Sequence, residues 1–189
     1  MKKNEIIFIT SNAKKYLAAK KYFNRTGFTL RRQNLECPEI QNMDVSEVVK
    51  FSVKFMAEKL KKPVIKSDQG FYIEALNGFP GAYMSDVERT IRKEGFKRIM
   101  QGVKNRQAKF VEALAYCSPG KEPIVFVAEK KGVLAKDFQG ANGFGIDFLF
   151  ILEGDGRAIA SFPKGRLAEV YDFKLWPEMI GFLERKHKK

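Results

Sequence analysis

A strand-length apolar run, followed at once by a polar turn and a helical pattern, constrains the fold of this chain more than any other feature. Residues 6–10 read Ile-Ile-Phe-Ile-Thr, and residues 13–23 carry apolar side chains at roughly helical spacing. A buried strand that leads directly into a helix is a building block of α/β proteins. We therefore expect an α/β fold that begins with a strand, a turn and a helix.

The rest of the chain alternates between strand and helix patterns and then changes character. The first half adds a short strand over 28–32, a helix from Asp44 to Leu60, and strands over 63–65 and 71–75. The second half adds a helical segment over 85–103 broken near Gly95, a hairpin of strands over 108–116 and 124–133, a strand over 148–152, and helices from about 167 interrupted at Pro177. Strands between helices, followed by a hairpin, indicate a sheet with both parallel and antiparallel pairs.

We therefore predict a mixed central sheet flanked by helices, in a single domain over residues 1–189 whose two lobes enclose a nucleotide-sized cleft. A chain of this length buries roughly 70% of its unfolded surface and needs no disulfide or metal for stability. The last residues, about 184–189, read as a basic tail that contains His187.

Charge and apolar content narrow the class of protein. The chain has 35 Lys and Arg against 22 Asp and Glu, a net charge of +13 that attracts polyanions such as nucleotides or nucleic acids. No apolar run approaches the roughly 18 residues needed to cross a bilayer, and the first ten residues lack the pattern of a secretory signal. Cys37 and Cys117, with one histidine, indicate neither a zinc site nor a disulfide framework. We expect a cytoplasmic protein with no membrane partner.

The polar turn from Thr10 to Lys15 is the first candidate site. It joins a buried strand to a helix N-terminus, where backbone N–H groups and the helix dipole favour anions. Asn12 adds a hydrogen-bond donor and Lys15 a cation for phosphate oxygens. The alternative is that Ser11 or Asn12 is an ordinary helix cap beside exposed lysines.

Asp68 is the second candidate because it follows a short apolar strand and precedes Gly70. A carboxylate at such a position can hold Mg²⁺ or orient a water, although turn residues of this type are common at strand ends. Glu47 is a possible second carboxylate, or else part of a capping box with Asp44. Lys54 lies two turns further along the same helix as Glu47, as a phosphate-binding cation or as one solvated lysine among many.

The third candidate is the Gly-rich segment that ends in Phe144, Gly145 and Asp147. An aromatic ring there can stack on a base, and an acid can contact the base or the sugar. A β-bulge with a core phenylalanine explains the same letters equally well.

Taken in order, these segments resemble the Ham1-type inosine triphosphate pyrophosphatase family. ITSNAKK resembles the family's T-x-N-x-x-K opening, SDQGFYIEALNGFPGAY resembles its (D/E)-D-(S/T)-G segment with the ALxGxPGxY that follows, and GFGIDFLF is similar to G-F-G-(Y/W)-D-P-x-F. The likeness covers about residues 6–152. The order and spacing of the segments make it far more specific than any one motif.

The resemblance implies Mg²⁺-dependent hydrolysis of the α–β phosphoanhydride of a nucleoside triphosphate, and a homodimer. It implies these roles by position: phosphate binding by Thr10, Asn12, Lys15 and Lys54, metal binding by Glu47 and Asp68, and base binding by Phe144, Gly145 and Asp147. Within this scheme we expect Asp68 to position or deprotonate the attacking water while the metal and lysines neutralise charge.

The chain departs from the family pattern beside Asp68 and near its C-terminus. Ser67 and Gln69 flank Asp68, so one acidic group and one hydroxyl are absent, and the aromatic-Asp-Pro step reads Ile-Asp-Phe around Asp147. The family's Ser-His-Arg, associated with reading the purine, is missing, and the nearest aligned stretch is residues 171–173, Tyr-Asp-Phe. Lys164 or Arg166 is a candidate to replace a phosphate-contacting lysine that the family has near this motif.

Three functions follow from these observations. The first is a divergent nucleoside triphosphate pyrophosphatase that releases pyrophosphate from an NTP or dNTP, with removal of non-standard nucleotides as its purpose. The second is a non-catalytic nucleotide-binding or sensor protein that has lost part of the metal site. The third, a nucleic-acid-binding protein, rests on charge alone, and because no recognition motif accompanies the charge we do not expect nucleic acid as a partner.

Overall fold

The computed structural model describes residues 4–187, which form one mixed sheet flanked by helices. The strands are β1 (Asn4–Ile9), β2 (Phe28–Gln33), β3 (Val64–Ile73), β4 (Pro80–Gly81), β5 (Gln107–Cys117), β6 (Ile124–Leu134) and β7 (Phe150–Leu152). Their order is β2-β1-β3-β5-β6-β7, with β4 against β3. β1 is parallel to both β2 and β3, and the other pairs are antiparallel. The predicted mixed α/β sheet is confirmed.

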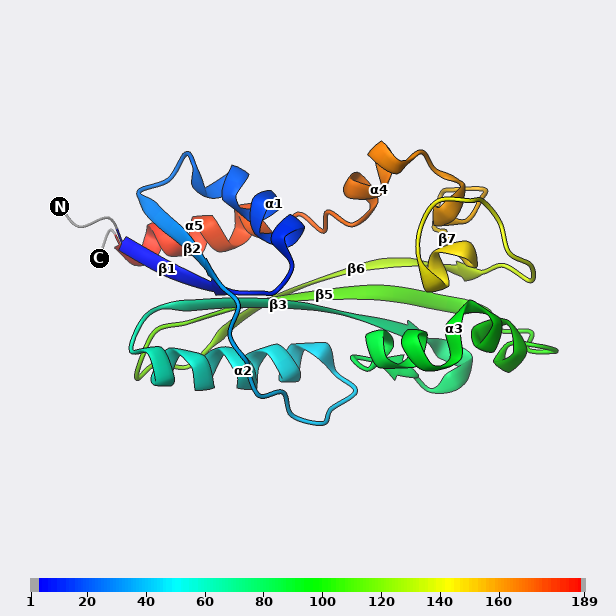
Figure 1. Cartoon of the computed structure of the whole chain (residues 1–189), viewed down its shortest axis with the longest axis horizontal. Coiled ribbons are helices and arrows are strands. Elements are labelled where there is room, and N and C mark those ends of the chain that lie inside the picture. The colour runs from blue at the N-terminus through cyan, green and yellow to red at the C-terminus, as the bar shows by residue number, and fades with distance from the viewer. Residues whose placement is uncertain (1–3, 188–189) are drawn as a thin grey trace.

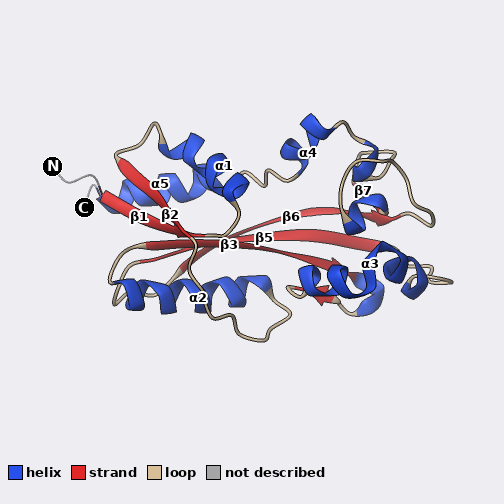
Figure 2. Ribbon diagram, viewed as in Figure 1, coloured by secondary structure: helices blue, strands red, loops and turns tan. Residues whose placement is uncertain are grey.

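Helices lie on both faces of this sheet (Figures 1 and 2). They are α1 (Ala13–Phe23), α2 (Val45–Leu60), α3 (Met84–Ile99), α4 (Lys164–Val170) and α5 (Leu175–His187), with short 3₁₀ turns η1 (Glu74–Leu76), η2 (Gly145–Phe148) and η3 (Ile159–Ser161). α1 and α5 cover one face at the end near β1 and β2, and α2 covers the other. In the described part of the chain, none of the helices is both long and apolar enough to cross a membrane.

The two faces of the sheet have separate cores because side chains alternate along each strand. Phe8 packs on the α1 and α5 side, where its ring meets Trp176 at 5.3 Å between centroids. Val49 and Val53 of α2 are fully buried against the opposite face. The helix predicted over 44–60 is confirmed.

The N-terminus of α2 is capped differently from our prediction. The Asp44 carboxylate accepts a hydrogen bond from the Ser46 N–H at 2.8 Å, but the Asp44 N–H donates to Asn42 Oδ1 at 2.8 Å. Glu47 therefore has no orphan N–H to bind, and it pairs with Lys50 at 3.3 Å instead. The capping box predicted from its spacing does not form.

β3 is one ten-residue strand where the sequence predicted two short ones. Every residue from Val64 to Ile73 has a partner in β5, from Cys117 back to Ala108. The polar letters Ser-Asp-Gln-Gly in its middle read as a loop, yet the ladder to β5 satisfies their backbone groups. Asp68 is therefore in mid-strand rather than at a strand end.

Two helix interruptions also differ from prediction. α3 has its non-helical residue at Arg92, with φ +55°, and not at Gly95. Pro177 lies in the first turn of α5, where a proline costs no intrahelical hydrogen bond, so it begins the helix rather than breaking it. Residues 184–187 of the predicted basic tail continue α5, and 188–189 lie outside the described residues.

Candidate active site

A pocket of about 1030 Å³ is lined by residues of α1 on one side, of α3 and η2 on the other, and of strands β3 and β5. This volume is at the upper end of the range for small-ligand sites and is large enough for a nucleotide. Its lining includes five of the predicted site residues, namely Asn12, Lys15, Asp68, Phe144 and Asp147. Segments far apart in the sequence thus meet at one cavity.

The α1 end of the pocket is cationic. Lys14, Lys15 and Lys21 line it together with Asn12. The Asn12 side chain caps α1 by accepting hydrogen bonds from the N–H groups of Lys14 at 2.9 Å and Lys15 at 3.2 Å. The cap role is therefore present, and it holds the start of the helix beside the pocket, where helix dipole and lysines attract anions.

Thr10 supports this turn from just outside the pocket lining. Its Oγ1 accepts a hydrogen bond from the Asn12 N–H at 3.1 Å, and its carbonyl accepts one from Arg32 Nε at 3.1 Å. The two bonds fix the chain between β1 and α1. Thr10 thereby positions Asn12.

Asp68 is a partly buried carboxyl in the floor of the pocket. Burial raises its pKa above the usual range, and the Lys15 cation opposes that rise. A carboxylate with a raised pKa is a stronger proton acceptor than an exposed one. Lys15 is therefore close enough to act on the charge of Asp68, an arrangement suited to binding a charged group and accepting a proton beside it.

Glu112 of β5 is a second carboxyl in this floor that the sequence reasoning missed. It stands opposite Gln69 in the ladder, and burial raises its pKa to about 7, against the influence of Lys15. The pattern of apolar residues along β5 is a sequence signal that could have identified Glu112. Ala108, Phe110, Leu114 and Tyr116 form the apolar face of β5, and Glu112 is the acid in the middle of that face.

The opposite end of the pocket is built on the loop before η2. The Phe144 ring is 69% exposed at the pocket, so it is available to stack on a ligand. Asp147 is 4% exposed, and its Oδ2 accepts a hydrogen bond from the Phe144 N–H at 2.9 Å while its Oδ1 accepts one from the Tyr171 hydroxyl. Gly145 lies between them, outside the lining, with φ +50°.

The segment aligned with the missing Ser-His-Arg does reach the pocket. Tyr171, Asp172 and Phe173 all line it. Burial raises the pKa of both Tyr171 and Asp147, so their hydrogen bond joins two groups shielded from water. Lys164 also lines the pocket, whereas Arg166 lies against the Phe162 ring and pairs with Asp155 at 3.6 Å.

Glu88 of α3 lines the same end and was not singled out by its sequence context. Its Oε1 accepts a hydrogen bond from the Ile146 N–H at 2.7 Å. Burial raises the pKa of Glu88 to about 7, and the nearby Asp147 carboxyl adds to the rise. A Cβ at Gly145 would stand 1.9 Å from Glu88 Oε1, so glycine permits this close approach.

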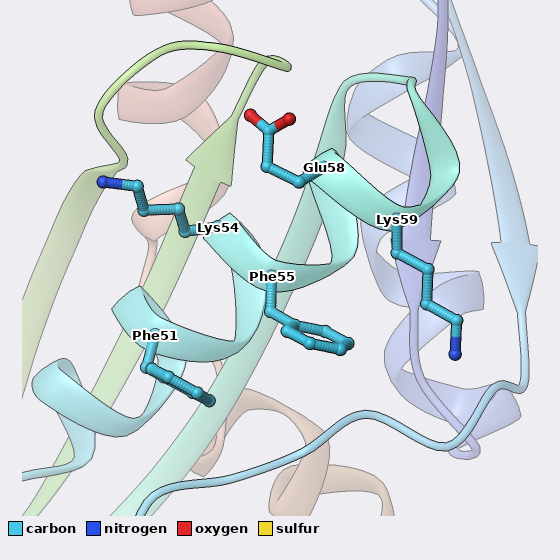
Figure 3. Close-up of a pocket in the computed structure, with 5 residues that line it drawn as sticks. All are labelled: Phe51, Lys54, Phe55, Glu58 and Lys59. Carbon is cyan, nitrogen blue, oxygen red and sulfur yellow. The ribbon is translucent and has the colours of Figure 1, made fainter.

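Glu47 and Lys54 are predicted site residues that the structure does not bring to this pocket. Both are on α2, which packs against the opposite face of the sheet through its valines. Glu47 pairs with Lys50, and Lys54 pairs with Glu122 at 2.6 Å. Lys54 instead lines a separate shallow hollow on the outer face of α2, with Phe51, Phe55, Glu58 and Lys59 (Figure 3).

Glu39, in the loop before α2, is an acid near Asp68 that the sequence reasoning did not consider. Its charge acts on Asp68, and it pairs with Lys66 at 2.6 Å. Among the described residues, however, no three His, Cys, Asp or Glu side chains converge closely enough to form a ready-made metal cage.

The cysteines take no part in this site. Cys37 is partly buried and Cys117 fully buried, and both are free thiols. Burial raises the pKa of each, which keeps them as unreactive thiols.

Two archaeal proteins are similar to this chain in amino-acid sequence. The chain is similar to the "dITP/XTP pyrophosphatase" of Methanopyrus kandleri, 40% identical over 156 residues and covering 82% of this chain and 83% of that protein. It is 37% identical to the protein of the same name from Thermococcus kodakarensis, over 82% of this chain and 83% of the relative.

Solved structures agree on the fold. A HAM1 protein from Coxiella burnetii superposes with a TM-score of 0.83 at 19% identity, covering 96% of this chain and 98% of that one. The Staphylococcus aureus Ham1 protein gives 0.78 at 23% identity, covering 96% and 99%. The model of the "Ham1 family" matches residues 6–169. The chain therefore belongs to the Ham1 family.

Proposed function

We propose that this protein is a nucleoside triphosphate pyrophosphatase that removes non-standard purine nucleotides from the NTP and dNTP pool. The observation that carries the proposal is the meeting of Asp68 and Lys15 in one pocket with Phe144. The names of the archaeal relatives, dITP/XTP pyrophosphatase, support hydrolysis as the activity and an oxopurine as the base.

The triphosphate binds at the α1 end. Lys15 binds its oxygens, and the dipole at the N-terminus of α1 adds to the attraction, because cations and a helix N-terminus together favour multiply charged anions. The base lies toward η2, against the exposed ring of Phe144. This orientation puts the phosphates above Asp68.

Asp68 accepts the proton of the attacking water. The water oxygen forms a bond to a phosphorus of the α–β anhydride, the bond from that phosphorus to the bridging oxygen breaks, and the water's proton passes to Asp68. The products are a nucleoside monophosphate and pyrophosphate. Lys15 neutralises charge that develops on the phosphate oxygens in this step.

We propose Mg²⁺ as the metal, held by Asp68 together with the substrate's own phosphates. The donor set fits, because Mg²⁺ is usually bound through one or two carboxylates plus phosphates and waters rather than by an all-protein cage. Asp68 as the one carboxylate supplied by the protein matches that mode. When bound, the ion supplies charge stabilisation for the departing pyrophosphate.

Release of pyrophosphate across a panel of NTPs and dNTPs tests the proposal. We expect turnover with Mg²⁺, fastest for inosine and xanthosine nucleotides, and loss of turnover when EDTA removes the metal. If no member of the panel releases pyrophosphate but a nucleotide binds tightly, the protein is a sensor and the catalytic proposal fails.

We also propose, from the family resemblance, that the protein is a homodimer located in the cytoplasm. Light scattering after size exclusion measures the first, and fractionation of the host cell the second. A monomer at micromolar concentration would contradict the dimer.

A further inference from the structure

Glu88, at the η2 end of the pocket, has hydrogen-bonding capacity left over. One carboxylate oxygen, Oε1, is used by the Ile146 N–H at 2.7 Å. In the described part of the chain the other oxygen has no hydrogen-bond partner, and no lysine or arginine pairs with the carboxylate. Because the residue lines the pocket and is partly buried, a ligand is the natural source of the missing donor.

Asp147, the acid that the sequence assigned to the base, is occupied by the protein itself. Tyr171 donates to one of its oxygens and the Phe144 N–H to the other. A Cβ at Gly143 would stand 2.8 Å from Asp147 Oδ2, so this carboxylate is enclosed by its own loop. Asp147 therefore holds the loop that presents Phe144, and the free acceptor at this end is Glu88.

The position of Glu88 relative to Phe144 gives the geometry of reading a base. Phe144 precedes Gly145 and Ile146, and Glu88 is bound to the backbone of Ile146. A base stacked on the Phe144 ring therefore has an edge near the Glu88 carboxylate. An ionised carboxylate is an acceptor only, so the matching group on the base is an N–H.

We propose that Glu88 is the specificity-determining residue of this pocket and accepts a hydrogen bond from an N–H on the edge of the base. The inference rests on the proposed function and narrows its substrate class to nucleotides whose base carries such a donor, as the N1–H of hypoxanthine and xanthine does. A hydrogen bond to a charged group contributes about 1.5–3 kcal/mol, which corresponds to roughly 10- to 150-fold in affinity.

The test measures binding rather than turnover, so that it stands apart from the catalytic proposal. The ligands are the α,β-methylene analogues of inosine triphosphate and of purine riboside triphosphate, whose base lacks any N–H. Their dissociation constants are measured by calorimetry at pH 8.5, above the raised pKa of Glu88, for the wild type and for Glu88→Gln. Glu94→Gln, an exposed glutamate of the same helix, is the matched control.

We expect Glu88→Gln to weaken the inosine analogue by at least about 10-fold and to leave the purine riboside analogue unchanged or tighter. The glutamine keeps an acceptor for the Ile146 N–H, so the loop is preserved, while its amide N–H₂ faces the base. Glu94→Gln should change neither constant. An equal loss for both ligands in Glu88→Gln would mean that Glu88 only supports η2, and would overturn the inference.

A wild-type measurement covers the case in which Glu88→Gln does not fold. The analogue of 1-methylinosine triphosphate keeps the oxo group but replaces the N1–H with a methyl group. We expect it to bind at least about 10-fold more weakly than the inosine analogue. Equal affinity for the two would overturn the inference. Discrimination by binding in a protein that releases no pyrophosphate would instead refute the catalytic proposal alone.

Discussion

The two ends of the pocket use opposite chemistry. At the α1 end, Lys14, Lys15 and Lys21 offer positive charge and a helix N-terminus. At the η2 end, Glu88 offers a hydrogen-bond acceptor beside the exposed ring of Phe144. Charge gives strong attraction but little selectivity among nucleotides, whereas a single directed acceptor gives selectivity at modest energy. Under the proposed function, the pocket therefore holds the nucleotide at one end and selects its base at the other.

The largest effect that this contrast predicts is on the chemical step. Asp68→Asn keeps the size of the side chain but replaces one carboxylate oxygen with an amide NH₂, so the side chain can no longer take a proton. We expect kcat to fall at least about 100-fold. Pyrophosphate release under saturating substrate measures this, and unchanged turnover would remove Asp68 from the mechanism.

The second-largest effect is expected from removing positive charge at the α1 end of the pocket. It should weaken the binding of every nucleotide to the same extent. We expect Lys15→Met to weaken binding of any nucleoside triphosphate by about 10- to 100-fold and to flatten its dependence on salt. Affinities for several triphosphates at two ionic strengths measure this. A loss confined to one base would show that the α1 end also selects, and would break the contrast.

Removal of the Phe144 ring at the η2 end should weaken binding of the nucleotide through its base. Phe144→Ala is expected to raise KM by about 5- to 50-fold with kcat nearly unchanged, because stacking on an aromatic side chain contributes roughly 1–3 kcal/mol per base. Inorganic triphosphate, which has no base, should compete equally well with wild type and variant. A lower kcat at unchanged KM would contradict the stacking role.

Glu112 allows a test by pH in metal-free buffer. Its pKa is about 7 in the folded chain against an ordinary 4.5, so between these values only the folded state holds the proton, and stability falls as pH rises. Glutamine has no proton to lose. Glu112→Gln should therefore gain up to about 3 kcal/mol over wild type at pH 8 and less than about 0.5 kcal/mol at pH 4.5.

Urea denaturation at the two pH values measures this difference. Glu153→Gln, at an exposed position, serves as the control and should show no comparable dependence. A gain for Glu112→Gln that is the same at both pH values would mean that packing rather than ionisation is responsible.

The smallest effect is expected on α2. Glu47→Gln and Lys54→Met each lie outside the pocket, so kcat and KM should stay within about twofold of wild type. Steady-state kinetics with the best substrate of the panel checks this. A loss as large as that of Lys15→Met would show that α2 contributes to the site after all.

These residues also show what the sequence can and cannot specify. Asn12, Lys15 and Asp68 were predicted because a strand, a turn and a helix start are local patterns, and the order of motifs adds to them. Glu47 and Lys54 share a helix face, but that spacing leaves open which site the face meets. That they lie beside Asp68 is a prediction about tertiary structure. The packing of α2 does not bring their side chains to the pocket that Asp68 lines.

The acids missed by sequence reasoning were missed for a different reason. Glu88 and Glu112 are single glutamates in a helix and a strand, with no neighbouring motif, and they matter because of what the fold brings against them. Only the apolar pattern around Glu112 gave a local signal. The sequence predicts two short strands in place of β3, because the polar residues at its centre are typical of a loop. Only the hydrogen-bonded ladder to β5 shows that the strand is continuous.

The unbroken pairing of β3 with β5 relates the length of the pocket to the number of residues in these strands. Both strands run beneath the phosphate end and the base end of the pocket, so the span between the two ends is counted in residues of extended backbone, about 3.3 Å each. Deleting one residue from β3 would shorten that span and also turn every later side chain to the opposite face. Under the proposed function, the residue count of β3 therefore sets the distance between the phosphate end and the base end of the bound nucleotide.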